Sequence, residues 1–210
     1  MEDTFEFKLR GIKGNTLGTS VRQSFMTLSQ LLTETPKTID TDIEIKYPML
    51  TEATEEWFLD TYAIEVNLLV DTILRTIFDL AESRPIVFSS FSPEVCVCLQ
   101  LKQDRYPVYF LTESGNIDAG DIRARSVQEA VHFARAWNLA GTIQRADPLL
   151  ASPRLVRYCQ QEGMRCGSWG GLNDDADNAK RLAKAGLDVI IVIDVKTIVK
   201  VVSDVSSGTV

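Results

Sequence analysis

Histidine and paired cysteine are scarce in this sequence. Its 210 residues include one histidine, His132, and four cysteines, Cys96, Cys98, Cys159 and Cys166. No two cysteines form a Cys-x-x-Cys pair, and no second cysteine pair or histidine completes a zinc-binding pattern. The sequence therefore argues against a structural zinc site, and we interpret the four cysteines as reduced thiols that pack as small apolar groups.

Long apolar runs and an excess of positive charge are also missing. No stretch approaches the roughly 18 consecutive apolar residues of a membrane span, and the acidic start MEDTFEFKLRG lacks the apolar run of a signal peptide. Lysine and arginine number 22 against 29 acidic residues, a formal net charge of −7, which repels nucleic acid. We therefore expect a cytoplasmic protein with no membrane span and no nucleic-acid partner.

Short apolar runs alternate with longer segments of helical periodicity along most of the chain. We expect strands at 39–47, 85–91, 106–112, 139–145, 164–169 and 189–194, and helices at 61–82, 93–103, 126–137, 153–163 and 175–186. Such alternation predicts an α/β protein with a parallel sheet and crossover helices, either a doubly wound sheet or a (β/α) barrel. About six strand-and-helix units are present, whereas a complete TIM barrel has eight.

Helix boundaries carry recognisable capping chemistry. Serine precedes proline at both 92–93 and 152–153, which is typical of an N-cap followed by proline in the first helical position. Ser126 and Glu129 have the spacing of a capping box. These signals support helices that begin at 93, 127 and 153.

The first 38 residues do not follow the alternating pattern. They contain the Gly-rich, basic stretch KLRGIKGNTLG at 8–18 and then a short helix expected within 25–36, which Pro36 ends. We interpret residues 1–38 as an insertion or linker segment with a short helix, and residues 39–210 as the barrel domain.

The stretch DIEIKYPML at 42–50 places charge in an apolar strand. Alternate side chains point to opposite faces, so Glu44 and Lys46 share one face while Ile43 and Ile45 share the other. In a parallel barrel the outward face packs against helices, and the carboxyl ends of the strands carry the chemistry. A carboxylate there suits Mg²⁺ or Ca²⁺, and an ammonium group suits a phosphate oxygen. The alternative is an ordinary ion pair on an edge strand.

Five segments together resemble one known family. IEIKYPML, IVFSSFSPEVCVCLQLKQ, YPVYFLTESG, SPRLVRY and GLNDDADNAKRLAKAGLDVIIV are similar, in this order, to the C-terminal part of a glycerophosphodiester phosphodiesterase domain, and most of all to fungal cytosolic glycerophosphocholine phosphodiesterases. The resemblance covers roughly 39–202. It implies a TIM barrel of the phospholipase-C-like phosphodiesterase type that hydrolyses small-molecule glycerophosphodiesters to glycerol 3-phosphate and an alcohol with a divalent cation.

The resemblance also implies roles for individual residues. The family's Glu-x-Lys strand motif matches Glu44 as a metal ligand and Lys46 as a catalytic residue that contacts the substrate or the transition state. Trp169 and Asn173 match an aromatic residue and an asparagine at a strand end, and Phe91 closes another strand. We therefore expect Phe91, Trp169 and Asn173 to line the substrate site.

Other family motifs are missing from this sequence. The family uses a His-Arg motif on its first strand, a Glu-x-Asp pair on its second and a His-Asp pair soon after, whereas His132 lies in a helical pattern. Leu9 in LRGIKGNT does not stand for the first histidine, because too few residues separate it from Glu44 to hold the second strand and the His-Asp pair.

We therefore expect a barrel that is incomplete at its N-terminus. Without positioned histidines, the rate enhancement from proton transfer, a factor on the order of 10²–10⁴, is lost. One carboxylate also supplies too few oxygen ligands for Mg²⁺ or Ca²⁺. This chain by itself is predicted to be inactive or nearly so, and to bind a cation only in the complete domain. A missing N-terminal segment or another chain would cover the open edges. The alternative function is a non-catalytic regulatory or scaffold domain of phosphate signalling, derived from the same barrel.

Overall fold

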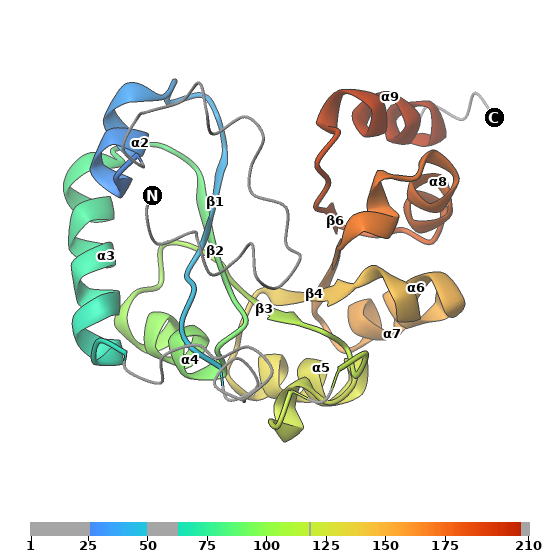
Figure 1. The fold of residues 1–210 in the computed structure, drawn as a ribbon, viewed down its shortest axis with the longest axis horizontal. Helices are drawn as coiled ribbons and strands as arrows, with labels where there is room; N and C mark the ends of the chain where they lie inside the picture. Colours follow the sequence, from blue (N-terminus) through green and yellow to red (C-terminus); the bar gives the residue numbers. More distant parts are fainter. Residues whose placement is uncertain (1–25, 50–62, 118, 207–210) are drawn as a thin grey trace, which may run out of the picture.

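The computed structural model describes residues 26–49, 63–117 and 119–206. The basic stretch 8–18 and the first residues of the helix expected at 61–82 lie outside the described residues. Within these ranges the chain forms one curved parallel sheet with helices packed along its outer side (Figure 1).

Six strands form the sheet. They are β1 (Thr41–Glu44), β2 (Ile86–Ser90), β3 (Val108–Thr112), β4 (Gly141–Arg145), β5 (Arg165–Trp169) and β6 (Val189–Ile190). Each strand pairs in parallel with the next one along the chain. A doubly wound sheet reverses its strand order at a switch point, and this sheet does not. The structure is therefore a half-barrel, which confirms the predicted α/β fold with an incomplete TIM barrel.

Eight α-helices connect or flank the strands in the described part of the chain. They are α2 (Leu28–Glu34), α3 (Val66–Leu80), α4 (Pro93–Lys102), α5 (Val127–Ala136), α6 (Ala146–Ala151), α7 (Arg154–Gln161), α8 (Ala176–Lys184) and α9 (Val195–Ser206). Figure 1 shows α3 on the left, α4 and α5 below, and α6 to α9 on the right of the sheet. The helix expected within 25–36 is confirmed as α2.

The strand expected at 189–194 is shorter than predicted. Regular pairing with β5 ends after Ile190, although the Ile191 N–H still donates to the Ser168 carbonyl at 2.8 Å. The backbone N–H groups of Ile193 and Asp194 donate to the Asp174 carboxylate at 2.7 and 2.9 Å and not to a neighbouring strand. This side-chain anchor ends the strand, and the chain continues into α9, which the sequence did not predict.

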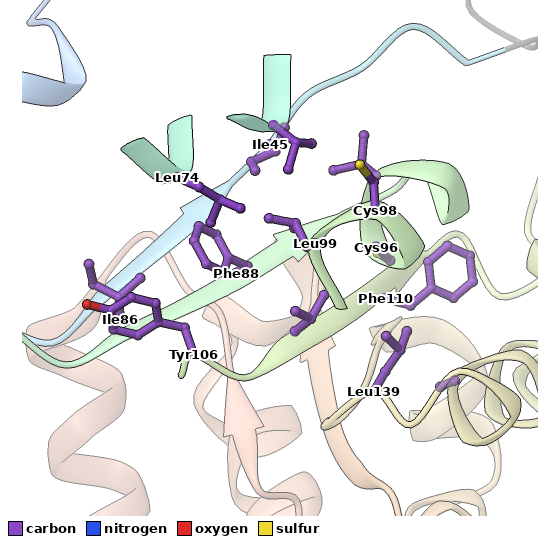
Figure 2. Close-up of a cluster of buried hydrophobic side chains, with 14 of the residues drawn as sticks. Ile45, Leu74, Ile86, Phe88, Cys96, Cys98, Leu99, Tyr106, Phe110 and Leu139 are labelled. Atoms are coloured by element: carbon purple, nitrogen blue, oxygen red, sulfur yellow. The ribbon is translucent and has the colours of Figure 1, made fainter. Parts of the chain in front are cut away.

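The larger apolar core lies between the sheet and the helices of its first half. Leu74 of α3, Leu99 of α4, Phe88 of β2 and Phe110 of β3 are buried there (Figure 2). Phe110 contacts Phe133 of α5 edge to face, with ring centroids 5.0 Å apart. This packing identifies the outward face of the strands, so the side chains that alternate with these residues point to the barrel interior.

A buried arginine joins the N-terminal helix to this core. Arg84, two residues before β2, is 2% exposed and donates to the carbonyls of Leu32, Thr35, Pro36 and Ile39 at 2.9 to 3.2 Å. Carbonyls at a helix C-terminus lack partners within the helix and carry partial negative charge. Arg84 therefore caps α2 and fixes the chain that leads into β1.

Candidate active site

The charged pair of the Glu-x-Lys stretch lies on the inner face of β1, at its carboxyl end. Ile43 and Ile45 pack with the helix-side core, so Glu44 and Lys46 point the other way. Lys46 Nζ lies 2.7 Å from Glu44 Oε1, and the lysine side chain is 82% exposed. An exposed ion pair contributes only about 0–1 kcal/mol to stability. The significance of the pair therefore lies in its position, because active sites of TIM barrels lie at the carboxyl ends of the strands.

Asp42 lies two residues before Glu44 on the same inner face. Its carboxylate accepts a hydrogen bond from Ser89 Oγ of β2 at 2.9 Å. Asp42 keeps exposed surface, yet partial loss of hydration raises the pKa of its carboxyl group. The Ser89 hydrogen bond opposes this increase in pKa, and the negative charge of Glu44 adds to it. Sequence reasoning missed Asp42, although the alternation that paired Glu44 with Lys46 also includes it.

Two of the residues expected to line the substrate site come together at the carboxyl ends of the strands, on the inner face of the sheet. We call this edge of the half-barrel the rim. Phe91, just after β2, and Trp169, the last residue of β5, contact edge to face with ring centroids 5.2 Å apart and planes at 89°. Both are half-buried and pack on an inner-face cluster of Tyr109, Leu111 and Ile143. The Trp169 indole N–H donates to the Thr112 carbonyl at 3.0 Å. Because that polar group is occupied, Trp169 offers an apolar ring surface.

Asn173, the third of these residues, is fully buried. Its Oδ1 accepts from Ser168 Oγ at 2.9 Å, and its Nδ2 donates to the Ile191 carbonyl at 3.0 Å. Asn173 therefore holds the short turn η3 (Gly171–Asp174) against β5 and β6. A direct contact with substrate stays a prediction for Asn173, and its hydrogen bonds support a positioning role.

His132 does not approach this rim. It lies on α5 with an exposed side chain, and its Nε2 is 3.5 Å from the Tyr158 hydroxyl of α7. The helical placement predicted from the sequence is confirmed.

An arginine at the end of β4 completes the rim, and sequence reasoning missed it. Arg145 Nη1 donates to Glu113 Oε2 at 2.9 Å, and its Nε donates to Asp147 Oδ2 at 2.8 Å. Its guanidinium carbon lies 5.6 Å from the centre of the Trp169 ring. The hydrogen bond with Glu113, followed by that with Asp147, raises the pKa of Arg145, so it stays charged. A signal was available in the sequence, because Glu113 directly follows the strand expected at 106–112 and Arg145 ends the strand expected at 139–145.

The described residues alone do not make a site for a divalent cation. No group of three or more histidine, cysteine, aspartate and glutamate side chains within them could hold a metal ion. At the β1 rim, Glu44 is already paired with Lys46, and Asp42 is the other nearby carboxylate on this strand. Mg²⁺ and Ca²⁺ take about six or more oxygen ligands, so these groups are too few.

Comparison with known proteins identifies the family of this fold and rim. A model of the glycerophosphoryl diester phosphodiesterase family matches residues 3–197. The chain belongs to this family. The expected likeness to fungal enzymes is also confirmed: the chain is 40% identical over 200 residues to glycerophosphocholine phosphodiesterase GDE1 of Eremothecium gossypii, covering 95% of this chain and 15% of that protein.

More distant family members show the same likeness. The chain is 31% identical over 177 residues to glycerophosphocholine phosphodiesterase GPCPD1 of Homo sapiens, covering 82% of this chain and 26% of that protein. It is also similar in fold to a glycerophosphodiester phosphodiesterase from Parabacteroides distasonis, with a TM-score of 0.56, 15% identity, and coverage of 79% of this chain and 58% of that one. The chain thus spans 15–17% of the length of the fungal relatives that it matches.

None of the helices that the structure describes is both long and apolar enough to cross a membrane. A cytoplasmic location stays a prediction.

Proposed function

We propose that this chain is the C-terminal part of a glycerophosphodiester phosphodiesterase domain whose complete form hydrolyses glycerophosphocholine. In that reaction the oxygen of water bonds to phosphorus, the bond from phosphorus to the choline oxygen breaks, and a proton from the water passes to that oxygen, so the products are glycerol 3-phosphate and choline. One observation carries the proposal: in a chain of this family, the Glu44–Lys46 pair lies on the inner face at the carboxyl end of a parallel strand. The names of the fungal and human relatives support this choice of substrate.

The charged groups of the rim have distinct proposed roles. Lys46 reaches into the interior as an exposed ammonium group, which stabilises negative charge that develops on a phosphate oxygen. Glu44 orients Lys46 through their 2.7 Å contact. In the complete domain we propose that Glu44 also supplies one ligand to Mg²⁺ or Ca²⁺, and that the remaining oxygen ligands come from parts of the domain outside the described residues. Such a cation would neutralise charge on the phosphodiester.

By itself the 210-residue chain is expected to show little or no turnover. His132, its single histidine, lies on the outer side of α5 and not at the rim. Proton transfer by a positioned side chain accounts for a factor on the order of 10²–10⁴. We propose that a preceding segment or another chain supplies the missing acid and base and covers the edges of the half-barrel.

The alternative is a regulatory or scaffold domain that has kept the barrel and lost the chemistry. The absence of a rim histidine from the described residues favours it. The retained Glu44 and Lys46 favour the enzyme. Sequencing the transcript upstream of the Met1 codon separates the two: in-frame His-Arg, Glu-x-Asp and His-Asp motifs support the enzyme, and their absence supports the scaffold.

The enzymatic test measures release of glycerol 3-phosphate from glycerophosphocholine with Mg²⁺ or Ca²⁺, for the 210-residue chain and for the longer product of the transcript. The longer product is expected to turn over, and Glu44→Gln to lower its rate about a hundredfold or more. Glu162→Gln is the matched control, because Glu162 is an ion-paired glutamate of the helix layer, 2.6 Å from Arg135. Equal activity of the Glu44→Gln protein would overturn the proposed role of the pair.

A further inference from the structure

The rim contains a second polar constellation, separate from Glu44 and Lys46. It consists of Glu113 after β3, Arg145 at the end of β4, Asp147 at the start of α6 and the Trp169 ring of β5. Arg145 pairs with Trp169 in the strand register, and Ile143 and Gly167 precede them on the same face. A Cβ on Gly167 would lie 2.9 Å from Ile143 Cγ1, so this face is closely packed toward the interior.

The loop after β3 fixes Glu113 beside Arg145. Ser114 Oγ accepts from the Arg145 backbone N–H at 3.1 Å and donates to Gln144 Oε1 at 2.7 Å. The Ser114 N–H in turn donates to Thr112 Oγ1 at 3.0 Å. The side chains of Glu113 and Arg145 are 17% and 33% exposed, so this pair is held in place while it still meets solvent.

The charge balance argues against binding of a quaternary ammonium group at this site. A cation attracted to the Trp169 ring would meet the Arg145 guanidinium, which already lies 5.6 Å from the ring centre. Glu113 is neutralised by Arg145, so its carboxylate offers little net attraction to a second cation. A quaternary ammonium group would therefore share both the aromatic ring and the carboxylates with the Arg145 guanidinium.

The same balance argues against a phosphate group. One guanidinium faces two carboxylates, Glu113 and Asp147, so the three side chains carry a net charge of −1. An anion would gain one cationic partner and be repelled by two anionic ones.

A neutral polyol suits these groups. Hydroxyl groups both donate and accept, so neighbouring hydroxyls can bind a carboxylate and a guanidinium N–H together. The apolar ring surface left by Trp169, whose N–H is bound to Thr112, packs on the C–H groups of a polyol. Within the described residues Arg145 Nη2 makes no hydrogen bond, which leaves a charged donor for a ligand hydroxyl.

We propose that Glu113 and Arg145, with Trp169, bind the glycerol end of the diester and so determine which end of the substrate lies at this side of the interior. The proposal rests on the proposed function for its substrate class. Three strand spacings, about 14 Å along the sheet, separate β1 from β4. Lys46 and Arg145 both lie on the inner face of this curved sheet, so we expect one extended substrate to contact both.

The test uses fluorescence of Trp169 in the 210-residue chain. Trp57→Phe and Trp137→Phe leave Trp169 as the one remaining tryptophan of three. In this background, sn-glycerol 3-phosphate is expected to change the emission in a saturable manner. Phosphocholine, choline and inorganic phosphate, which lack the glycerol, are expected to have at least tenfold weaker effects.

Variants then assign the binding to these residues. Arg145→Ala and Glu113→Gln are each expected to weaken sn-glycerol 3-phosphate binding about tenfold, which is about 1.4 kcal/mol, because each variant loses a charge-assisted hydrogen bond to the ligand. Arg123→Ala is the matched control, because Arg123 also pairs with two carboxylates, Glu94 and Asp121, and lies 5.5 Å from the Phe133 ring, but in the helix layer. Its binding is expected to be unchanged.

Three results would overturn the inference: no response to sn-glycerol 3-phosphate, an equal response to phosphocholine, or equal weakening by Arg123→Ala. These results are independent of the hydrolysis assay. If Glu44→Gln abolishes turnover of the longer protein but sn-glycerol 3-phosphate does not change the Trp169 emission, the glycerol site alone is rejected. A glycerol-specific response in a protein whose longer form never hydrolyses the diester rejects the enzyme alone.

Discussion

Three arginines of this chain have different roles that follow from position and not from local sequence. Arg84 is buried and caps the end of α2. Arg123 is held by Glu94 and Asp121 between helices, and Arg145 is held by Glu113 and Asp147 at the strand ends. Arg123 and Arg145 each pair with one glutamate and one aspartate, yet of these two only Arg145 faces the interior. A residue's type and pairing therefore describe its chemistry, and the strand that carries it decides whether substrate can reach that chemistry.

Asp42 gives a prediction at the same scale. Burial raises the pKa of its carboxyl group, so the folded state holds the proton more tightly than the unfolded chain. The stability gained from the protonated form is present below the unfolded pKa and is lost as pH rises through the folded one. Asp42→Asn should therefore raise the urea midpoint at pH 7, and this advantage should shrink as the pH is lowered toward about 4, near the unfolded pKa of aspartate.

Asp40→Asn, at an exposed position before β1, is the control for the loss of one carboxylate from this stretch. A decrease in stability of Asp42→Asn at neutral pH that disappears on acidification would show instead that the carboxylate is stabilising in its ionised form.

At the scale of elements, two identical dipeptides behave differently. Ser92 is the N-cap of α4, and its Oγ accepts from the Val95 N–H at 3.3 Å, as its sequence predicts. Ser152 stands before Pro153 in the same way, but α7 begins after Pro153 and has no side-chain cap; Ser152 Oγ accepts instead from Arg154 Nε at 3.1 Å. The N-cap predicted at 152 was wrong, because α6 ends at Ala151 and its last turn determines the backbone at Ser152.

These two serines provide a matched pair for mutation. Ser92→Ala should lower the free energy of unfolding by about 1 kcal/mol, since it removes a buried capping bond. Ser152→Ala should change it by less than about 0.5 kcal/mol. Urea unfolding followed by circular dichroism measures both, and equal losses would contradict the assigned caps.

At the scale of the whole molecule, the half-barrel formed by the described residues is open along the outer edges of β1 and β6. In the described part of the chain, β1 and β6 each pair with one strand only. Ile193, just beyond β6, is 91% exposed, and Ile191 and Val195 beside it are also exposed. The open edges of β1 and β6 in this part of the chain can pair with another chain, and the exposed apolar side chains that follow β6 add apolar surface to such a contact.

We therefore predict that the isolated 210-residue chain self-associates. Sedimentation velocity should show larger species as concentration rises, and Ile193→Lys should shift the distribution toward monomer. Leu101→Lys replaces an apolar residue of α4 that is 72% exposed but lies in the helix layer, and it should have no such effect. A wild-type chain that stays monomeric throughout would reject the prediction.

The sequence by itself determined the order and type of most elements, because apolar periodicity and capping residues act over a few neighbouring positions. It also determined that Glu44 and Lys46 share a face, since strand alternation is local. Only the tertiary structure decided that β6 ends after two residues, that Asn173 is buried and that Arg145 reaches the ring of Trp169. Those outcomes depend on contacts between segments 18 to 32 residues apart in the chain, which no local pattern encodes.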